Sequence, residues 1–586
     1  MNKTLLFSLL TALPLCAQSL QEQADNMQQP QLAEGAKQLT FPTIPGAKVS
    51  LLGADYASLV RADGKIRPVA EAVPVHVSYT VTRGKEKVTS RDYTITLPAA
   101  GEKAEESGNP KPQIIPELLA WRGDKGQFTL PDTLVVSDKL PEFVCKELAA
   151  ATGKQVERPD NTDARCHIGC SMFKHGSFVG KEGYMLVITE NHIKIIAERP
   201  KGIFYATRTL LQMLAQDKSS LPCGTAVDMP RFRLRGFVFD VGRLPVPMSF
   251  VKEVVDTMAW YKMNDLHLHL NDNYIFHEDY VKEGKDPMKE SYAAFRMESK
   301  VKGLTAADTS YTKMEFAALV KYAAERGVNI VPEFDTPGHA LSFTRVRPDL
   351  IYQGPMPRHA DRRCEMLDAA NPATLQFVGS VWDEYLLPRN KAVFEGCGAV
   401  HVGSDEFFGD KEDYRRYLDG LLAHIQQRGY TPRAWGSLLI KSGNTPVRSK
   451  GVQMNIWSRD WGRAWQSINQ GYSIINTFDR DLYCVPTANY YRMDKNLPAL
   501  WQNWLPNRMT DETIPAGHPQ LLGAAWAVWN DMIGPRHNGY TYEDLRPTIR
   551  EVSGTLSQKM WGKDTPPHSY EEHQRLMERI GVPQSK

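Results

Sequence analysis

Residues 312–340 read TKMEFAALVKYAAERGVNIVPEFDTPGHA, and this stretch contains the pattern from which the fold can be predicted. Its first part, TKMEFAALVKYAAERG, has the apolar spacing of a helix and ends at a glycine. The following VNIVPEFD is an apolar run of strand length that ends in acidic residues, and Pro337 and Gly338 then force a turn. A helix followed by a buried strand with polar residues at its end is typical of parallel α/β folds.

In all, eight apolar runs of strand length occur between residues 234 and 530, separated by helical stretches such as residues 249–262 and 412–429. The eight runs are LRGFVFDVG (234–242), NDLHLHLND (264–272), VNIVPEFD (328–335), AVHVGSDE (399–406), PRAWGSL (432–438), GVQMNIW (451–457), SIINTF (473–478) and LGAAWAVWN (522–530). This number of strands alternating with helices over about 350 residues predicts an α/β fold, a (β/α)8 TIM barrel.

Two smaller units are predicted in front of the barrel, which we place at residues 229–586. Residues 112–228 should form a small α+β domain, and residues 30–110 a short β-rich region with a linker rich in Pro and Gly. The α+β domain is expected to contain a strand at 128–137, helices at 141–153 and 202–217, and a hairpin at 182–198.

The first 17 residues have the pattern of a secretory signal peptide. Lys3 supplies a positive charge, residues 5–15 are apolar but too few to cross a bilayer, and Ala17 suits the position before a cleavage site. A lipid anchor on Cys16 is the less favoured alternative, because Leu15 stands where a small residue is usual. We therefore expect an exported protein that is periplasmic, cell-surface or secreted.

Composition narrows the class of function. The 586 residues include 70 Lys and Arg against 68 Asp and Glu, and this near-neutral balance argues against a nucleic-acid binder. Twelve Trp and 23 Tyr suit a large core or a site that stacks sugar rings. Eight cysteines are too few for a disulfide scaffold, so buried thiols or one or two bridges are expected. Cys166 and Cys170 lack a second pair at zinc-ligand spacing.

Active sites of TIM barrels lie at the carboxyl ends of the strands. The polar and aromatic residues that follow the predicted strands are therefore the candidate functional residues. They are Asp240, Arg243, Asp272, Glu333, Asp335, Asp405, Glu406, Trp435, Trp457 and Trp529.

The densest signal is HVGSDEFFG, in which Asp405 and Glu406 are adjacent. Adjacent side chains on an extended chain point to opposite sides, so the two carboxylates need not have the same role. One can donate a proton if burial and the neighbouring carboxylate raise its pKa, while the other orients a substrate group. A solvated helix N-terminus would use the same pair, and the two residues alone do not decide between these interpretations.

Two other strand ends carry candidate groups. In IVPEFDTPGHA, Glu333 and Asp335 end the strand, and the Pro-Gly turn places His339 near the barrel mouth. In LRGFVFDVGR, Asp240 and Arg243 follow the strand, and a guanidinium offers a planar fork of donors that suits sugar hydroxyls or carboxylates.

Taken in order, RGFVFDVGR, LHLHLND, IVPEFDTPGHA and HVGSDE resemble glycoside hydrolase family 20, the β-N-acetylhexosaminidases. The resemblance covers most of residues 233–531, and residues 182–214 resemble the α+β domain of that family. It implies a retaining enzyme in which the substrate's own 2-acetamido oxygen attacks the anomeric carbon and gives an oxazolinium ion. No cofactor is implied.

The resemblance also implies a role for each matching residue. Glu406 corresponds to the general acid and base, Asp405 to the carboxylate that orients the acetamido group, and Tyr483 to the hydroxyl that binds the acetamido oxygen. Asp272 and His339 correspond to a relay, with His339 between Asp272 and Glu406. The substrate-binding residues would be Arg243 for the ring hydroxyls, Trp435, Trp457 and Trp529 for the walls around the sugar, and Asp531 for a distal hydroxyl.

The sequence departs from the family pattern at two places. The family often has two glycines before the acid pair, and the second position is Ser404 here. After the second strand it commonly has two acids and a Trp-containing loop, whereas Asp272 is followed by Asn273 and Tyr274. The altered loop bears on the shape of the sugar subsites rather than on the chemistry.

Other functions fit some of these residues. His267 and His269 form an HxH pair on one strand face, as in metal-dependent barrel hydrolases, with His339 and Asp405 as further ligands. A non-catalytic glycan-binding protein would keep the pocket, although both acids are present. Within the family, a lacto-N-biosidase-like enzyme would release a disaccharide.

The sequence thus predicts an exo-acting β-N-acetylhexosaminidase that removes terminal β-linked GlcNAc or GalNAc from glycans. Glycans are the expected partners, and neither nucleic acid nor stable membrane insertion is expected.

Overall fold

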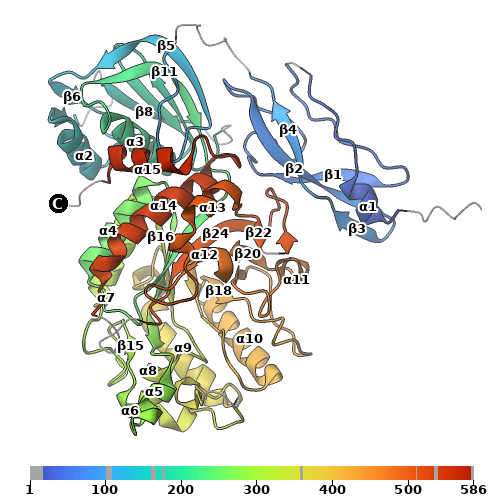
Figure 1. Ribbon diagram of the computed structural model, residues 1–586, viewed down its shortest axis with the longest axis vertical. Helices are drawn as coiled ribbons and strands as arrows, with labels where there is room; N and C mark the ends of the chain where they lie inside the picture. The colour runs from blue at the N-terminus through green and yellow to red at the C-terminus, as the bar shows by residue number, and fades with distance from the viewer. Residues whose placement is uncertain are drawn as a thin grey trace, which may run out of the picture.

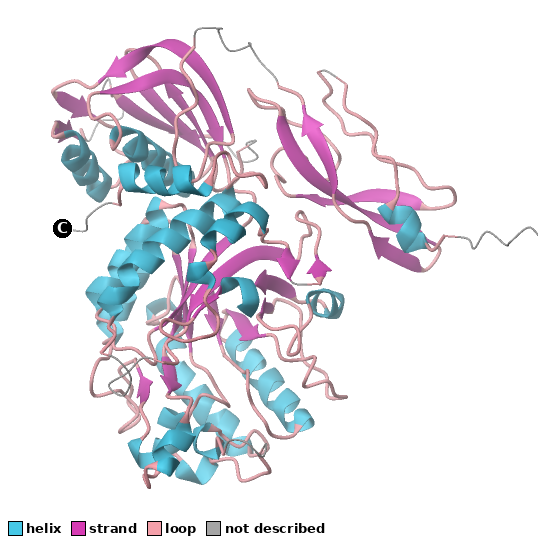
Figure 2. Cartoon of the chain, in the orientation of Figure 1, coloured by secondary structure: helices cyan, strands magenta, loops and turns pink. Residues whose placement is uncertain are grey.

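The computed structural model describes residues 18–33, 35–99, 108–159, 166–173, 179–356, 361–509, 511–532 and 539–582. The predicted signal peptide, with Cys16, and the first part of the predicted linker lie outside these residues. Three main sheets follow one another along the chain (Figures 1 and 2). No helix of the described part is long and apolar enough to cross a membrane, and no disulfide joins its seven cysteines.

The first unit is a four-stranded antiparallel sheet with one short helix, α1 (Leu20–Asp25). Its strands are β1 (Lys48–Ala54), β2 (Val73–Arg83), β3 (Glu86–Thr89) and β4 (Tyr93–Leu97), and β2 pairs with each of the other three. Buried and exposed residues alternate along β4, as its sequence YTITL predicts. This region therefore has the expected β-rich character.

The second unit has a five-stranded sheet in the order β5-β11-β9-β10-β8. Its elements are β5 (Ala120–Thr129), β6 (Thr133–Val135), α2 (Glu142–Thr152), β7 (Gln155–Glu157), β8 (Ile168–Met172), β9 (Tyr184–Ile188), β10 (Ile193–Ala197), α3 (Pro200–Leu214) and β11 (Ser220–Asp228). The predicted hairpin forms as β9 and β10. The single strand predicted at 128–137 is wrong: β5 ends before Pro131, whose missing N–H cannot continue a ladder, and β6 begins after it.

The third unit is a closed barrel of eight parallel strands, so the predicted TIM barrel is confirmed. The order is β12-β13-β16-β17-β18-β19-β20-β24, and β24 pairs back with β12, as between Trp526 and Phe237. The strands are β12 (Leu234–Asp240), β13 (Asp265–His269), β16 (Asn329–Glu333), β17 (Ala399–His401), β18 (Thr431–Trp435), β19 (Gln453–Ile456), β20 (Ser473–Asn476) and β24 (Leu521–Val528). Every residue of β12 is buried, as expected for a parallel strand covered on both faces.

Helices follow most barrel strands and cover the outside of the barrel (Figure 1). The longer ones are α4 (Met248–Trp260), α7 (Lys313–Glu325), α9 (Pro372–Leu386), α10 (Lys411–Gln427), α11 (Ala464–Gln470), α13 (Leu497–Asn503) and α14 (Arg546–Trp561). Shorter elements are β14 (Asn271–Asn273), α5 (His277–Lys282), α6 (Pro287–Glu290), β15 (Ala293–Phe295), α8 (Leu341–Val346), α12 (Asp479–Leu482), β21 (Tyr483–Cys484), β22 (Arg508–Met509) and β23 (Glu512–Thr513). Five 3-10 turns complete the described elements: Pro348–Leu350, Arg363–Glu365, Arg389–Lys391, Met493–Lys495 and Tyr542–Leu545.

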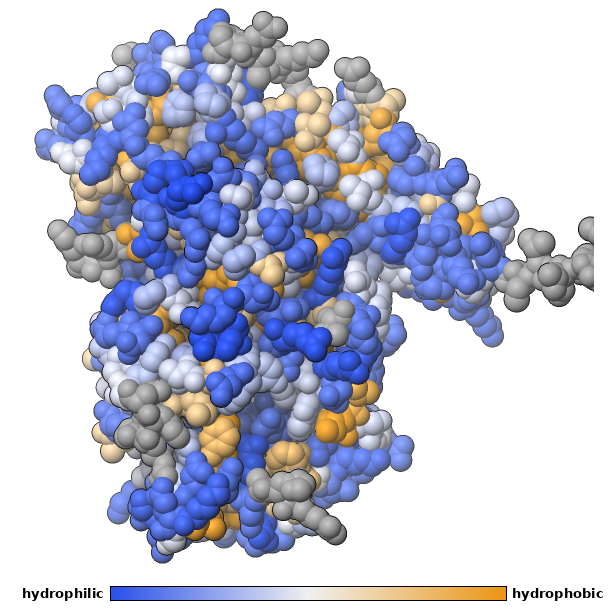
Figure 3. All heavy atoms as spheres, viewed as in Figure 1, coloured by the Kyte–Doolittle hydropathy of each residue, from blue (hydrophilic) through white to orange (hydrophobic). Residues whose placement is uncertain are grey.

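Close contacts join the three units. The last helix, α15 (Tyr570–Ile580), lies beside the second unit in Figure 1, and Arg579 donates to Gln113 at 2.9 Å. The first unit contacts the barrel segment through Arg231 Nε, which lies 2.8 Å from Asp55 Oδ2 in a buried ion pair. The outer face seen in Figure 3 is mostly hydrophilic, with small apolar groups scattered over it. Both smaller units thus contact the part of the chain that contains the barrel.

Candidate active site

A cavity of about 230 Å³ lies where the carboxyl ends of the barrel strands meet. It is lined by Arg243, His269, Asp272, Ile275, Asp335, His339, Arg362, Asp405, Glu406, Trp457, Tyr483, Tyr491, Trp529 and Asp531. The family resemblance assigned roles to ten residues, and nine of these ten line this one cavity. Trp435 is the exception, because its ring is buried beneath the cavity wall and lies 5.6 Å from the ring of Trp529.

The acid pair lies on a tight turn. Strand β17 ends at His401, and Gly403, Ser404 and Glu406 have positive φ angles of 68°, 79° and 43°. The expectation that the two carboxylates point to opposite sides is wrong, because this turn bends the chain and both line the same cavity. A Cβ at Gly403 would lie 1.8 Å from Asp335 Oδ1, so only glycine fits there. Ser404 holds a left-handed conformation that glycine adopts at lower cost, which accounts for the family's second glycine.

Asp405 lies beside a second buried carboxyl group, that of Asp335, and the two share a hydrogen bond. Burial, and then the nearby Asp405, raises the pKa of Asp335 well above its usual range, and burial also raises the pKa of Asp405. A protonated Asp335 can therefore donate to an ionised Asp405. The other oxygen, Asp405 Oδ1, is buried and has no hydrogen-bond partner among the described residues, so a ligand donor can bind it.

Glu406 and the predicted relay occupy the neighbouring wall. His339 Nδ1 lies 3.1 Å from Asp272 Oδ1, and its Nε2 lies 3.5 Å from Glu406 Oε2. Burial would lower the pKa of His339, but Asp272 and Glu406 raise it well above the usual range. Burial would raise the pKa of Glu406, but His339 and Arg362 hold it below the usual range. These opposite shifts favour a proton on His339, next to the carboxylate of Glu406.

Arg243 lies among three carboxylates. Its Nη2 is 2.7 Å from Asp272 Oδ2, and its Nη1 is 3.0 Å from Asp240 Oδ2 and 3.4 Å from Asp531 Oδ1. Tyr490 donates to Asp531 Oδ2 at 3.1 Å. These contacts fix Arg243 and Asp531 side by side at one end of the cavity, where their remaining donors and acceptors can meet the hydroxyls of a sugar ring.

Aromatic rings form the rest of the wall. The Tyr483 and Trp529 rings are 5.6 Å apart, and Tyr491 lies 5.4 Å from Tyr483. The indole N–H groups of Trp457 and Trp529 are buried without a hydrogen-bond partner among the described residues. Apolar ring faces combined with a few polar groups are what a sugar ring requires of a binding site.

Five lining residues had no role in catalysis or sugar binding assigned to them from the sequence: His269, Ile275, Asp335, Arg362 and Tyr491. Asp335 was a candidate only by its place at the end of a predicted strand, and His269 was considered only as a metal ligand. Arg362 lies in an irregular loop segment, DRRCEM, that matches no motif, so the sequence offered no signal for it. Its Nη1 donates to Glu406 Oε2 at 2.7 Å.

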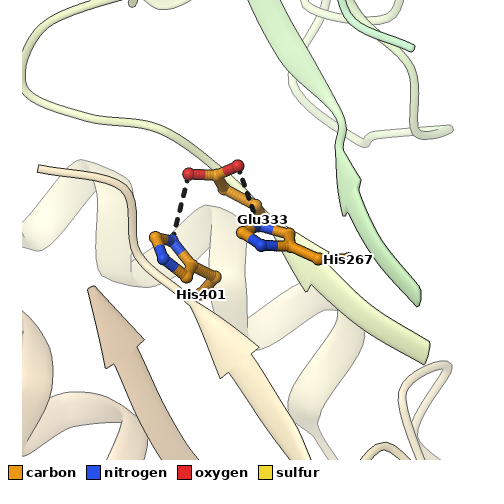
Figure 4. A group of neighbouring side chains, drawn as sticks. All are labelled: His267, Glu333 and His401. Carbon is orange, nitrogen blue, oxygen red and sulfur yellow. Dashed lines mark hydrogen bonds and ion pairs between the residues drawn. The ribbon is translucent and has the colours of Figure 1, made fainter. Parts of the chain in front are cut away.

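Beneath the cavity, Glu333 is surrounded by ring nitrogens (Figure 4). Its Oε1 accepts from Trp435 Nε1 at 2.6 Å and lies 3.0 Å from His401 Nδ1, while its Oε2 lies 2.9 Å from His267 Nε2 and 2.5 Å from His269 Nδ1. Burial would raise the pKa of Glu333, but the three histidines lower it well below its usual range. The lone-pair directions of the carboxylate are therefore occupied, which suits a hydrogen-bonded core cluster better than a metal ligand.

The ligand set considered for a metal is also divided in space. Among the described residues, His267 groups with Glu333 and His401, and His269 with Glu333 and Asp335. His339 and Asp405 group with Asp335, so no single group contains all four proposed ligands. The HxH pair does lie on one strand face as expected, because both of its histidines contact Glu333.

A larger cavity of about 700 Å³ lies between the first unit and the barrel, lined by residues such as His76, Asp92, Arg231 and Trp465. It contains none of the predicted site residues. The smaller cavity is therefore the candidate active site, because the carboxylate pair, the relay and the aromatic walls converge there.

Comparisons with known proteins identify the family of the chain. The model of the glycosyl hydrolase family 20 catalytic domain matches residues 232–417, and the model of that family's domain 2 matches residues 111–229. A beta-hexosaminidase of Akkermansia muciniphila is 29% identical over 317 residues, which are 49% of this chain and 61% of the relative. A lacto-N-biosidase of Bifidobacterium bifidum is 23% identical over 526 residues, which are 83% of this chain and 43% of the relative.

Solved structures share the fold. The beta-N-acetylhexosaminidase from Bacteroides fragilis has a TM-score of 0.62 at 20% identity, over 80% of this chain and 96% of that chain. A mutant Streptomyces plicatus beta-hexosaminidase in complex with product (GlcNAc) has a TM-score of 0.63 at 19% identity, over 82% of this chain and 97% of that chain. The chain belongs to glycoside hydrolase family 20, so the resemblance found in the motifs is confirmed.

Proposed function

We propose that this protein is an exo-acting, retaining β-N-acetylhexosaminidase that removes terminal β-linked GlcNAc or GalNAc by substrate-assisted catalysis. Family membership supports the hydrolysis of glycosides, and beta-hexosaminidases are among the relatives and solved structures. One observation carries the chemistry: the buried, unpartnered Asp405 Oδ1 lies beside Glu406 in a cavity lined by aromatic rings.

Asp405 is suited to orient an acetamido group. Its Oδ1 can accept the N–H of the substrate's acetamido group, while Asp335 holds the carboxylate from the other side. With its N–H bound there, the acetamido group directs its carbonyl oxygen toward the anomeric carbon. The Tyr483 hydroxyl would donate to that oxygen and hold it in line. A retaining enzyme with a protein nucleophile instead needs two carboxyls facing each other across the sugar, roughly 5–5.5 Å apart.

In the first step, the acetamido oxygen forms a bond to the anomeric carbon while the bond to the glycosidic oxygen breaks. The glycosidic oxygen takes a proton from Glu406, which receives it from His339 as the negative charge on the leaving oxygen develops. The positive charge of the oxazolinium ion is stabilised by the Asp405 carboxylate.

In the second step, water attacks the anomeric carbon from the side that the leaving group has vacated. Glu406 accepts a proton from that water, and the acetamido oxygen departs, which restores the acetamido group. Two inversions at one carbon give net retention of configuration. No proton is lost or gained over the cycle, because the acid used first is restored by the water.

The size of the cavity supports release of a single sugar. Its volume of about 230 Å³ is below the roughly 300–1,000 Å³ typical of pockets for larger ligands. Arg243 and Asp531 close the end where the hydroxyls of a terminal residue would lie. A pocket that receives a whole disaccharide before the scissile bond would need more room.

The test is hydrolysis of 4-nitrophenyl β-GlcNAc and β-GalNAc, with and without N-acetylglucosamine thiazoline, a stable mimic of the oxazolinium ion. We expect turnover that the thiazoline blocks and EDTA leaves unchanged. Turnover that the thiazoline does not inhibit would contradict substrate assistance. Loss of turnover with EDTA would favour the metal-dependent alternative. Binding without turnover on aryl glycosides and on lacto-N-biosides would favour a glycan-binding protein.

We also propose that the protein is exported, as the sequence pattern of residues 1–17 suggests. Fractionation of the native host, followed by N-terminal sequencing of the mature chain, tests this. Full-length protein in the cytoplasm with an intact N-terminus would contradict it.

A further inference from the structure

Arg362 connects the predicted general acid to a second, fully buried carboxylate. Its Nη1 donates to Glu406 Oε2 at 2.7 Å, and its Nε donates to Glu365. Glu365 is held in turn by His277 and Asn273. Because both edges of the guanidinium are engaged, Arg362 is fixed in one orientation next to Glu406.

The adjacent arginine provides a contrast within the same loop. Arg363 pairs with Asp361, and its side chain is 44% exposed, whereas the side chain of Arg362 is only 14% exposed. Arg362 lines the cavity and Arg363 does not. Contact with Glu406 is therefore specific to Arg362. Replacing Arg363 removes the same charge from the same loop and serves as a matched control.

One nitrogen of Arg362 is left without a protein partner. Its Nη2 is buried and has no hydrogen-bond acceptor among the described residues. A buried donor that is left unsatisfied costs about 1–3 kcal/mol, so an acceptor on a ligand would relieve this cost. With Asp335 protonated, the cavity wall carries four carboxylates, and they are balanced by Arg243, Arg362, His269 and His339. The wall has no excess of positive charge to attract an anion, which favours a neutral acceptor such as a sugar hydroxyl.

The neighbours of Glu406 place the guanidinium group of Arg362 on the leaving-group side. His339 Nε2 and Arg362 Nη1 both lie near Glu406 Oε2, at 3.5 Å and 2.7 Å, and Asp405 and Tyr491 are the other titratable groups that face Glu406. A general acid must contact the glycosidic oxygen, the atom that joins the terminal sugar to the departing residue. The terminal sugar occupies the space between the aromatic walls, so Arg362, bonded to the acid, borders the departing residue.

We propose that Arg362 recognises the leaving sugar and orients Glu406 toward the glycosidic oxygen; this inference rests on the proposed function. Its Nη1 fixes the Glu406 carboxyl toward the glycosidic oxygen, and its Nη2 donates a hydrogen bond to a hydroxyl of the departing residue. Arg362 is thus a specificity-determining residue for natural glycans, whose leaving group is a sugar, rather than for aryl glycosides.

The charge of Arg362 has a second, measurable effect. Burial would raise the pKa of Glu406, whereas His339 and Arg362 lower it. His339 and Glu406 hold one proton between them, so removing the Arg362 charge raises the pKa at which this pair loses its last proton. Asp405, being an anion, acts in the opposite direction to Arg362 and is unchanged in such a variant. Loss of Arg362 therefore moves the alkaline limb of the pH profile to higher pH.

The experiment compares Arg362→Met, Arg362→Lys and the control Arg363→Met in the full chain. Each is assayed across pH on N,N′-diacetylchitobiose, whose leaving group is a sugar, and on 4-nitrophenyl β-GlcNAc. For Arg362→Met we expect kcat/KM to fall about tenfold more on the disaccharide than on the aryl glycoside, and the alkaline limb to rise by about one pH unit. Arg362→Lys should keep the alkaline limb at the wild-type pH, because it retains the positive charge. It should lose the preference for the disaccharide over the aryl glycoside, because an ammonium group lacks the forked donors of a guanidinium. Arg363→Met should match the wild type in both readouts.

Equal losses on both substrates with an unmoved limb would overturn the inference and indicate a structural role for Arg362. If Arg362→Met does not fold, Arg362→Lys decides, because wild-type discrimination in that variant would equally overturn it. Failure of the proposed function is a distinct outcome: the wild-type protein itself would then hydrolyse neither substrate.

Discussion

His269 joins the buried carboxylate of Glu333 to Asp272 of the proposed relay, with its Nδ1 2.5 Å from Glu333 Oε2 and its Nε2 2.7 Å from Asp272 Oδ2. Burial would lower the pKa of His269, but Glu333 and Asp272 raise it well above its usual range. A protonated imidazole can therefore donate to both carboxylates. The core of the barrel and the relay that supports Glu406 form one continuous network.

Replacing Glu333 with Gln should weaken both the fold and the activity. The substitution keeps the size of the side chain but leaves the buried His269 with one counter-charge fewer. Breaking a buried ion pair costs about 3–5 kcal/mol, so we expect the free energy of unfolding to fall by about 3 kcal/mol in urea titrations. We also expect kcat/KM to fall, because His269, which contacts Asp272, loses the carboxylate that holds it from the other side. Glu325→Gln, at the exposed end of α7, is the control, and equal stability of the two variants would refute the prediction.

The ion pair of His269 and Glu333 makes the free energy of unfolding depend on pH. His269 has a raised pKa, so its contribution is fully present below about 6.5 and is lost as pH rises through its folded pKa. Glu333 has a lowered pKa, so its contribution is present above about 4.3 and is lost as pH falls through its folded pKa. The stability difference between wild type and Glu333→Gln should therefore be largest between these limits. Urea titrations at a series of pH values measure it, and a difference that stays constant across pH would contradict the assignment.

Ser404 gives a test of backbone strain at the acid pair. It has a φ of 79°, and its hydroxyl donates to Thr336 O at 2.9 Å. Ser404→Gly relieves the backbone but loses the hydrogen bond, whereas Ser404→Ala loses the bond and keeps the strain. We expect the Gly variant to be more stable than the Ala variant by about 1 kcal/mol in thermal or urea unfolding. An Ala variant as stable as the Gly variant would mean that the turn is not strained.

The barrel could be predicted because each strand carries its own signal. An apolar run such as 234–240 is long enough to be recognised alone, and parallel strands place the residues after them at one end. This local pattern located Arg243, Asp272, Asp405 and Glu406 without any knowledge of distances. Spacing along the chain was sufficient wherever a residue directly follows a strand.

The contacts that tune the site could not be predicted in this way. Arg362 reaches Glu406 from an irregular loop, 44 residues away along the chain, and no sequence periodicity encodes that approach. The shared position of the two acids depends on positive φ angles at Ser404 and Glu406, which an extended-strand model does not contain. The burial of Trp435 follows from its hydrogen bond to Glu333, a contact between distant strands.

Asp335 should act through its proton rather than through its charge. Its pKa is raised by burial and by Asp405, so it is the protonated partner that donates to Asp405, and its Oδ1 accepts from Ser404 N at 2.8 Å. Asp335→Asn preserves both a donor and an acceptor and should retain activity within about tenfold, whereas Asp335→Ala should lose at least about tenfold more. Steady-state kcat/KM on an aryl β-GlcNAc measures this. Similar losses in the two variants would mean that the hydrogen bond is not what matters.

The division of labour between the two adjacent acids makes the sharpest prediction. Glu406→Gln removes the proton donor, so turnover should fall by about 10²–10⁴-fold on N,N′-diacetylchitobiose and much less on 4-nitrophenyl β-GlcNAc, whose leaving group needs little assistance. Asp405→Asn should impair both substrates to a similar degree, because departure of either leaving group requires attack by the acetamido group. Comparing kcat/KM of the two variants on the two substrates separates these roles, with Asp410→Asn, the N-cap of α10, as a control outside the cavity. Equal losses of Glu406→Gln on both substrates would remove the assignment of Glu406 as the general acid.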